Sequence, residues 1–363
     1  MYEVLIMHAL LSSILSAFSI PGEILTYDTP SDGNINKTYR VSLRHNGEVR
    51  RYVVQGINQY VFPRPDHVME NIRLVTAHLR KKEPERTVLH FYETADGALL
   101  TAAGGEVWRV CDLIPSVTHS GRPSPMAAEQ AGTAFGHFGM LLSDLDPKGL
   151  HEIIPGFHDT VSRYQALHHA AAADPLGRAA EVQEELQRLL ALEEVACTLT
   201  RLQQQGALPL RVTHNDTKIS NILFDPTGEH PVAVIDLDTV MPGLLAHDYG
   251  DAIRSAANQS AAEDDLRGAR MDERILEAFT AGFLRETGTV LSAMERETLY
   301  LAPIVMTAET AVRFLSDYLM GDPYFRPRYP GHNLQRARMQ MRLAEDLFAR
   351  RAEIAAIIRK YLP

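Results

Sequence analysis

The chain has 363 residues, which is too long for one ordinary domain and enough for two lobes with cores of their own. Hydrophobic residues make up 45% of it and charged residues 23%, as is usual for a soluble globular protein. The formal net charge of −10 excludes binding to nucleic acid or to an anionic membrane through the overall field of the protein.

The two cysteines and the first residues indicate a cytoplasmic protein. Cys111 and Cys197 have no metal-ligand spacing and form no disulfide framework, which favours two reduced thiols. The first 20 residues are apolar, but they lack a basic start and are interrupted by His8 and several serines. They predict an amphipathic helix that ends before Pro21, rather than a signal peptide or a membrane span.

The first third of the chain predicts a small sheet. Residues 37–43 and 51–57 are strand-like and flank Asn46-Gly47, and Asn-Gly between two such runs indicates a hairpin. A helix is expected over 66–81 from apolar residues at helical spacing. Two further strands are expected at 87–93 and 107–114.

After Pro115 the pattern becomes helical. Helices are expected at 127–142 and 178–204, and again from residue 240 to the C-terminus. Between them lie two strand-like stretches, LPLRV and VAVID, which predict a small central hairpin. We therefore expect an α+β fold with a sheet-rich lobe over residues 1–114 and a large helical lobe over residues 115–363.

Residues 213–221, THNDTKISN, contain a His, an Asp two residues later and an Asn five residues after that Asp. This is the spacing of a kinase catalytic loop. Phosphoryl transfer needs a base for the acceptor hydroxyl, which predicts that role for Asp216, and Mg²⁺, to which Asn221 could offer its side-chain oxygen. His214 is expected to brace the loop.

An apolar strand that ends in Asp follows at 232–238, VAVIDLD. Asp236 at the strand end could bind Mg²⁺ between phosphates. If the strand continues, Asp238 points the same way and could bind metal or substrate. Each motif alone also fits a turn or a helix N-cap, but their order and spacing together favour the functional interpretation.

The stretch DGNINKTY at 32–39 precedes the first strand pair. A turn of small residues between strands can lay backbone N–H groups over phosphates. With one glycine, it is equally well explained as an ordinary β-turn.

The stretches THNDTKISN, VIDLDTVMPG and HDYGD resemble the aminoglycoside phosphotransferase superfamily, the small-molecule relatives of protein kinases. Phrases over nearly the whole chain, among them DGNINKTY, WRVCDLI and RFLSDYLMGDPYF, are similar to the N-acetylhexosamine 1-kinase group within it. The resemblance implies a two-lobed protein-kinase-like fold, ATP and Mg²⁺ as cofactors, and transfer of the γ-phosphate to the anomeric hydroxyl of GlcNAc or GalNAc. It implies a base at Asp216 and metal ligands at Asn221 and Asp236.

The resemblance also implies two sets of binding residues. The nucleotide would be bound by Gly33, Asn34, Asn36, Lys37, Thr38, Gln55 and Leu113. The acceptor sugar would be bound by Asp238, Arg313, Asp317, Tyr318, Arg336 and Trp108.

One feature departs from the family pattern. Protein kinases carry a lysine on the third strand, paired to a glutamate on the next helix, but here that strand reads YVVQGIN, with Gln55 and Gly56. Glu70 is the natural helix glutamate, and Lys37 could supply the missing positive charge.

Several of these residues have plainer explanations. Arg313 and Asp317 are four residues apart and could form a surface ion pair. Tyr318 and its aromatic neighbours could belong to a core, and so could Trp108.

The catalytic core alone also fits a kinase of another small hydroxyl substrate, such as an aminoglycoside, choline, homoserine or another sugar. The missing strand lysine keeps open a non-catalytic pseudokinase that only binds nucleotide. Oligomerisation is expected to stop at a monomer or weak dimer.

Overall fold

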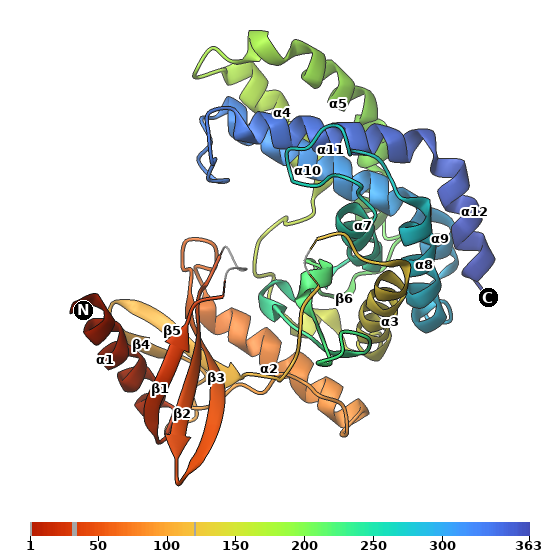
Figure 1. The fold of residues 1–363 in the computed structure, drawn as a ribbon. Coiled ribbons are helices and arrows are strands. Elements are labelled where there is room, and N and C mark those ends of the chain that lie inside the picture. The colour runs from red at the N-terminus through yellow and green to blue at the C-terminus, as the bar shows by residue number, and fades with distance from the viewer. Residues whose placement is uncertain (1, 31–34, 120) are drawn as a thin grey trace. The chain divides into compact units, whose positions relative to one another are not determined.

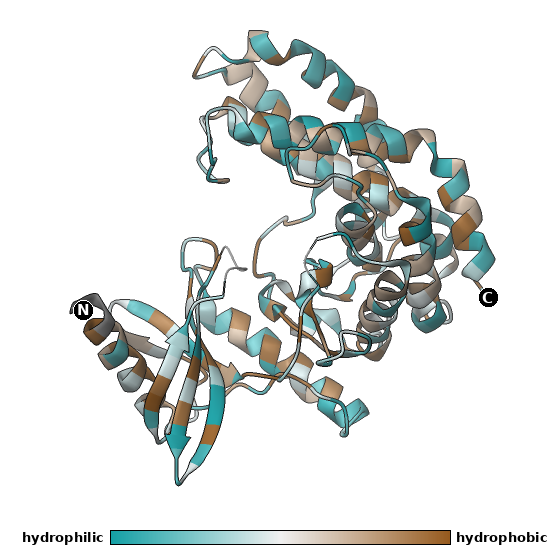
Figure 2. Ribbon diagram, viewed as in Figure 1, coloured by the Kyte–Doolittle hydropathy of each residue, from teal (hydrophilic) through white to brown (hydrophobic). Residues whose placement is uncertain are grey.

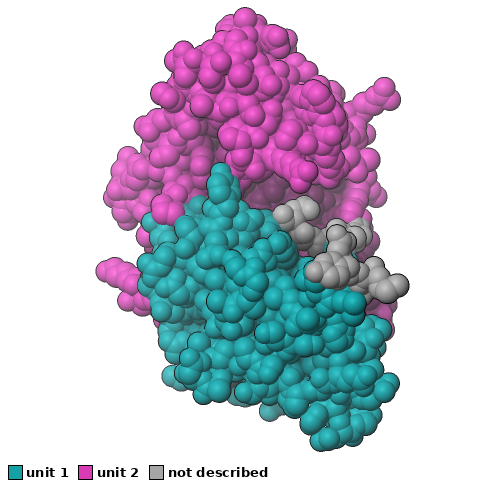
Figure 3. All heavy atoms as spheres, turned by 90° about the vertical axis from the view of Figure 1, so that its left-hand side faces the viewer, with its two compact units in different colours: residues 1–116, 150–154, 237–240 teal, residues 117–149, 155–236, 241–363 magenta. Residues whose placement is uncertain are grey.

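The computed structural model describes residues 2–30, 35–119 and 121–363, which divide into two compact units (Figures 1 and 3). Unit 1 comprises residues 1–116, 150–154 and 237–240, and unit 2 comprises the rest. The sequence placed the boundary at 114/115 and missed the two short segments that return to unit 1. No helix among the described residues is long and apolar enough to cross a membrane.

Unit 1 is built on a five-stranded antiparallel sheet of order β1-β2-β3-β5-β4. Its elements in chain order are α1 (Tyr2–Ala17), β1 (Glu23–Asp28), β2 (Lys37–His45), β3 (Glu48–Ile57), α2 (Pro65–Lys82), β4 (Thr101–Ala103) and β5 (Glu106–Asp112), with a 3₁₀ turn, η4 (Leu237–Thr239), from the second returning segment.

The β2–β3 hairpin forms as the sequence predicts. Asn46 and Gly47 have φ values of 52° and 82°, the backbone conformation of the tight turns that match the twist of paired strands. Burial alternates over residues 41–43 of β2 and 52–56 of β3, and hydrophilic and hydrophobic residues alternate along these strands in Figure 2. The buried face, including Val41, Val54 and Trp108, packs against α1.

Packing against Trp108 explains why a glycine stands at position 56. It pairs with Trp108 across β3 and β5, and a Cβ built on it would lie 3.1 Å from the Trp108 ring. The indole is 1% exposed, and its Nε1 donates a hydrogen bond to the Ala103 carbonyl at 2.9 Å. A larger residue at position 56 would therefore displace the tryptophan.

Unit 2 is mostly helical. Its helices are α3 (Pro125–Leu141), α4 (Thr160–Ala173), α5 (Gln183–Ala196), α6 (Thr198–Gln204), α7 (Leu245–Ala256), α8 (Glu273–Thr287), α9 (Ala293–Thr298), α10 (Ala302–Leu319), α11 (His332–Ala349) and α12 (Arg351–Tyr361), with short 3₁₀ turns η1 (Pro147–Gly149), η2 (Ala179–Val182), η3 (Ile219–Asn221) and η5 (Leu299–Leu301). One core lies around α3, α7 and α8, and a second lies among α4, α5, α10 and α11.

Four short strands in unit 2 carry the loops of interest. They are β6 (Arg211–Thr213), β7 (Ile222–Phe224), β8 (Pro231–Val234) and β9 (Met241–Gly243), paired as β6-β9 and β7-β8. The predicted central hairpin is therefore wrong in its pairing, because LPLRV and VAVID belong to different sheets. VAVID pairs instead with β7, which is nearer to it along the chain, and β6 pairs with β9, beyond VAVID.

Helices α3 and α8 approach each other at glycines. A Cβ on Gly132 would lie 2.1 Å from the Phe279 carbonyl oxygen, and one on Gly282 would lie 2.1 Å from the Glu129 carbonyl oxygen. The two backbones are thus in direct contact, which holds α3 and α8 at a fixed spacing.

Candidate active site

The loop after β6 carries Asp216 and closes on itself through Asn221. The Asn221 amide nitrogen donates to the Asp216 backbone oxygen at 2.8 Å and approaches carboxylate oxygen Oδ2 at 3.3 Å. The five-residue spacing in the sequence is therefore the spacing that returns Asn221 to Asp216. Because the amide nitrogen makes these bonds, Oδ1 is the atom with which Asn221 could bind a metal.

His214 braces this loop, as expected. Its Nδ1 accepts from the Asp216 backbone N–H at 3.3 Å, and its Nε2 lies 2.9 Å from the Ile235 carbonyl. These contacts assign the proton to Nε2. The Ile235 N–H in turn donates to the Asn221 backbone oxygen at 2.9 Å. The residue just before Asp236 is thus tied to both ends of the catalytic loop.

Asp236 is exposed, and its φ of 61° lies in the left-handed region. A non-glycine residue there stores backbone strain, and such residues concentrate at functional sites. β8 ends at Val234, so the strand does not continue through Asp236 as the sequence suggested. The predicted alternation of Asp236 and Asp238 is therefore wrong, and Asp238 belongs to unit 1 on η4.

Asp248 on α7 is a functional residue that the sequence analysis missed. Its carboxylate oxygens accept the backbone N–H groups of His214 at 2.9 Å and Asn215 at 2.7 Å. Asn215 has a φ of 64°, so the carboxylate holds the loop in a conformation that few residues adopt. Burial raises the pKa of Asp248, opposed by the hydrogen bonds it accepts. The phrase HDYGD was the only signal for it.

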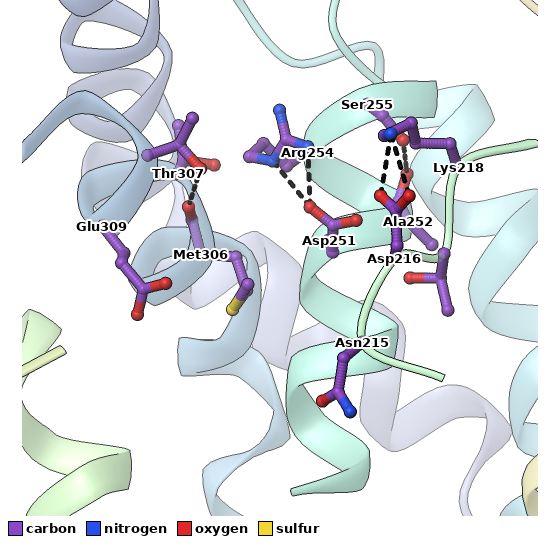
Figure 4. Close-up of polar contacts among 12 residues, drawn as sticks. Asn215, Asp216, Lys218, Asp251, Ala252, Arg254, Ser255, Met306, Thr307 and Glu309 are labelled. Atoms are coloured by element: carbon purple, nitrogen blue, oxygen red, sulfur yellow. Dashed lines mark hydrogen bonds and ion pairs between the residues drawn. The ribbon is translucent and has the colours of Figure 1, made fainter. Parts of the chain in front are cut away.

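Charged side chains beside Asp216 pair with one another (Figure 4). The Lys218 ammonium lies 2.9 Å from the Asp216 carboxylate, and Arg254 donates to Asp251 at 2.6 and 2.9 Å. Burial opposes protonation of Lys218, but the carboxylates of Asp216, Asp251 and Asp236 raise its pKa. Burial likewise opposes ionisation of Asp251, but Arg254 lowers its pKa. Asp216 and Asp251 are therefore each paired with a cation.

The oxygen atoms of Asn221 and Asp236 fit Mg²⁺, which prefers carboxylate and amide oxygens and binds through one or two of them together with substrate phosphates. Within the described part of the chain, no group of three His, Cys, Asp or Glu side chains could hold a metal by itself. This donor set therefore suits a metal that arrives with a nucleotide.

The predicted nucleotide residues lie in unit 1, except that Gly33 and Asn34 fall outside the described residues. The Gln55 amide donates to Thr38 Oγ1 at 3.1 Å, and the Asn36 amide donates to Asp238 at 2.6 Å. Lys37 instead pairs with Glu106 at the surface. The Leu113 N–H donates to the Arg51 carbonyl at 3.2 Å.

Arg313 is enclosed by aromatic rings. Its guanidinium lies 5.4 Å from the ring centres of Phe157 and Phe325 and 6.0 Å from that of Tyr324. Asp317 holds this loop, because its carboxylate accepts the backbone N–H groups of Tyr324 at 2.9 Å and Phe325 at 2.8 Å. The Asp317 carboxylate is therefore used to hold backbone N–H groups, and not in the surface ion pair with Arg313 that the spacing allowed.

The other predicted acceptor residues each have partners within their own unit. Tyr318 is buried in the second core, with the Arg178 guanidinium 4.5 Å from its ring centre. Arg336 pairs with Glu263 at 2.8 Å. Trp108 and Asp238 lie in the interior of unit 1, each with the partners given above. The sequence could not show that these polar and aromatic residues are buried.

A unit with a small antiparallel sheet, followed by a helical unit whose loop carries Asp216 and Asn221 before Asp236, defines the class of kinase-like small-molecule phosphotransferases. The chain belongs to the phosphotransferase enzyme family, whose model matches residues 26–288.

Several solved structures have a fold similar to that of this chain. An aminoglycoside phosphotransferase from Alicyclobacillus acidocaldarius is 16% identical over 96% of both chains, with a TM-score of 0.64. A spectinomycin phosphotransferase bound to ADP and spectinomycin is 12% identical over 93% of this chain and 97% of that one, with a TM-score of 0.56. An ethanolamine kinase from Plasmodium vivax is 12% identical over 86% and 80%, with a TM-score of 0.52.

The kinase-like fold expected from the sequence is thus confirmed. The protein is therefore a phosphotransferase that acts on a hydroxyl acceptor.

Proposed function

We propose that the protein phosphorylates the anomeric hydroxyl of an N-acetylhexosamine, GlcNAc or GalNAc, with Asp216 as the base. Asp216 accepts the hydroxyl proton as the sugar oxygen bonds to the γ-phosphorus and the bond to ADP breaks. Asn221 and Asp236 hold Mg²⁺, which neutralises phosphate charge when bound. Positioning and electrostatics supply most of the rate.

The pairing of charges beside Asp216 is the observation that supports a neutral acceptor. An aminoglycoside is a polycation and requires carboxylates that are available to it. Here Asp216 is paired with Lys218, and Asp251 is paired with Arg254. Glu309 on α10 is paired with His158 at 2.9 Å. A polyhydroxyl sugar exchanges hydrogen bonds with such paired groups without requiring a net charge.

The aromatic box around Arg313 argues against choline. Aromatic rings bind quaternary ammonium groups through their faces, but these faces already hold the protein's own guanidinium. The outer N–H groups of a guanidinium so held remain suitable donors to sugar hydroxyl and acetamido oxygens. We assign Arg313 to sugar binding on this basis. The family phrases outside the catalytic loop support the same acceptor.

The test is ADP release from Mg-ATP with GlcNAc, GalNAc, glucose, galactose, choline, homoserine and kanamycin. We expect release with GlcNAc or GalNAc, and a ³¹P signal of the product coupled to the anomeric proton. Asp216→Asn should lower kcat by roughly three orders of magnitude or more while leaving the melting temperature unchanged, because it removes the base but keeps the side-chain shape.

Asp96→Asn, at an exposed turn of unit 1, is the matched control and should keep full activity. Release with kanamycin or choline alone would retain the phosphotransferase and reject the sugar site. A folded Asp216→Asn variant with wild-type turnover would reject Asp216 as the base.

A further inference from the structure

A buried arginine in unit 1 connects two residues at the start of β2. The Arg109 side chain on β5 is 3% exposed. Its Nε and Nη2 donate to Gln55 Oε1 at 3.0 and 2.8 Å, and the Gln55 amide donates to Thr38 Oγ1. Its Nη1 lies 2.5 Å from Asp238 Oδ1, and the other carboxylate oxygen accepts from the Asn36 amide. One guanidinium thus reaches Thr38 through Gln55 and Asn36 through Asp238.

The register of the sheet explains why Arg109 contacts Gln55. Gln55 and Arg109 are directly paired across β3 and β5 and share the sheet face opposite to Val54 and Trp108. On that face the guanidinium lies 5.3 Å from the Phe91 ring centre and 3.6 Å from Met69 Sδ on α2. The position is enclosed, so the charge is balanced within the protein by Asp238 and does not project towards a ligand.

The glutamate that would pair with a strand lysine and the lysine that could replace it are both paired elsewhere. The Glu70 carboxylate on α2 lies 2.5 Å from His151 Nε2. The Lys37 ammonium is 61% exposed and pairs with Glu106. Arg109 is therefore the buried cation next to the position where the sequence lacks a lysine.

We propose that Arg109 is a positioning residue for the nucleotide phosphates, acting through Asn36 and Thr38 rather than by touching ATP. Asn36 is fixed on a second side as well, because its Oδ1 accepts the Asn58 backbone N–H at 3.0 Å. The segment that enters β2 is held at both residues by groups that Arg109 orients. The proposal rests on the assignment of residues 36–38 to the phosphates, and it does not depend on which acceptor is used.

The first experiment compares ATP with adenosine, because adenosine lacks the phosphates that this segment would contact. Dissociation constants of Mg-ATP and adenosine are measured by calorimetry for wild type and Arg109→Met, below the melting temperature of each. We expect the ATP constant to rise about tenfold or more and the adenosine constant to change less than about twofold. The KM for ATP should rise likewise, with the KM of the acceptor unchanged.

The matched control is Arg40→Met, which removes an exposed ion pair with Asp28 on β1 and β2 of the same sheet. Both ligands should bind to it as to wild type. An equal loss of ATP and adenosine affinity in Arg109→Met, or no loss in a folded variant, would overturn the proposal.

Removing a buried charge partner can unfold a protein, so a milder variant is included. Gln55→Met replaces a partly exposed side chain, cuts the path to Thr38 and leaves the ion pair of Arg109 with Asp238 in place. It should weaken ATP binding by about threefold and leave adenosine binding unchanged. Unchanged ATP binding in this variant would also overturn the proposal.

Asn36→Ala distinguishes the role of the phosphate segment from the role of Arg109. If it leaves the ratio of ATP to adenosine affinity unchanged, the assignment of the phosphate segment is wrong, and with it the role of Arg109. If Asn36→Ala changes the ratio and Arg109→Met does not, the segment assignment stands and only the role of Arg109 is wrong.

Discussion

His247 is a buried imidazole on α7 whose two ring nitrogens have no hydrogen-bond partner among the described residues. Its ring centre lies 5.1 Å from that of His158, which also contacts the Asn215 carbonyl of the catalytic loop at 3.2 Å. Burial, and then the neighbouring His158, lower the pKa of His247 to about 3. The folded protein therefore keeps this ring neutral under conditions in which the unfolded chain protonates it.

The sign of the resulting pH dependence follows from proton counting. Between its ordinary pKa of 6.5 and the folded value of about 3, the unfolded state binds more protons at His247. The free energy of unfolding is therefore at its full value above pH 6.5. It decreases as the pH is lowered, by about 1.4 kcal/mol per pH unit well below 6.5. Glu309 acts in the same direction at lower pH: burial opposes its ionisation, but His158 lowers its pKa to about 2.

We predict that His247→Leu removes this dependence without losing a hydrogen bond. Urea unfolding at about pH 7 and pH 5 should show the free energy of unfolding of wild type falling relative to the variant by about 2 kcal/mol in total. His169→Gln, at an exposed position on α4, should run parallel to wild type. Parallel curves for His247→Leu would show that the buried ring carries no such linkage.

At this scale, the sequence predicted the residues whose roles depend on local spacing. Asp216 and Asn221 are five apart and meet within one loop, so their contact could be anticipated. Asp248 and Arg109 act through partners more than 30 residues away along the chain, in contacts to Asn215 and Asp238 that no spacing encodes. Those contacts depend on tertiary packing, and a single sequence does not contain that information in readable form.

Among the secondary-structure elements, the predicted strand at 87–93 is wrong. Phe91 forms an isolated bridge to Cys111, and two backbone hydrogen bonds join residues 90 and 92 to β5, but no regular strand forms there, and β4 pairs with residues 106–108 of β5. The stretch is rich in β-branched and aromatic residues, but such composition does not name a pairing partner. The hairpin at Asn46-Gly47 was predictable because its turn chemistry selects both the conformation and the partner.

The close approach of α3 and α8 leads to a prediction at the same scale. Gly132→Ala should lower the free energy of unfolding by about 2 kcal/mol or more, because its Cβ would meet the Phe279 backbone. This loss should exceed the roughly 1 kcal/mol by which alanine favours a helix. Thermal unfolding followed by circular dichroism measures it.

Gly149→Ala is the comparison, since a Cβ there has nothing within 4 Å and the residue lies in the same unit. It should change stability by less than about 0.5 kcal/mol. A Gly132→Ala variant as stable as Gly149→Ala would mean that the two helices can separate at no cost.

For the whole molecule, the metal and the nucleotide should stabilise the protein only together. Mg²⁺ alone finds few protein ligands, so it should not shift the melting temperature, whereas ADP with Mg²⁺ should raise it by a few degrees at about 100 times its dissociation constant. EDTA should remove most of that shift. A full shift with ADP in EDTA would exclude metal-dependent binding.

Asp236→Asn tests the assigned ligand in the same assay. Asparagine tolerates the left-handed backbone of Asp236, so the variant removes the charge without adding strain. The Mg²⁺-dependent part of the ADP shift should be lost, while the melting temperature without ligand stays as in wild type. An unchanged shift would move the metal site away from Asp236.

The packing of Trp108 against Gly56 has a practical consequence. This is the one tryptophan in the chain, and it lies in the interior of unit 1. Its fluorescence therefore reports the environment of unit 1 alone, whereas far-ultraviolet circular dichroism is dominated by the helices, most of which belong to unit 2. Both signals can be recorded along one denaturation curve without any added label. Coincident transitions would mean that the two units unfold as one cooperative block. Separated transitions would give the stability of each unit on its own.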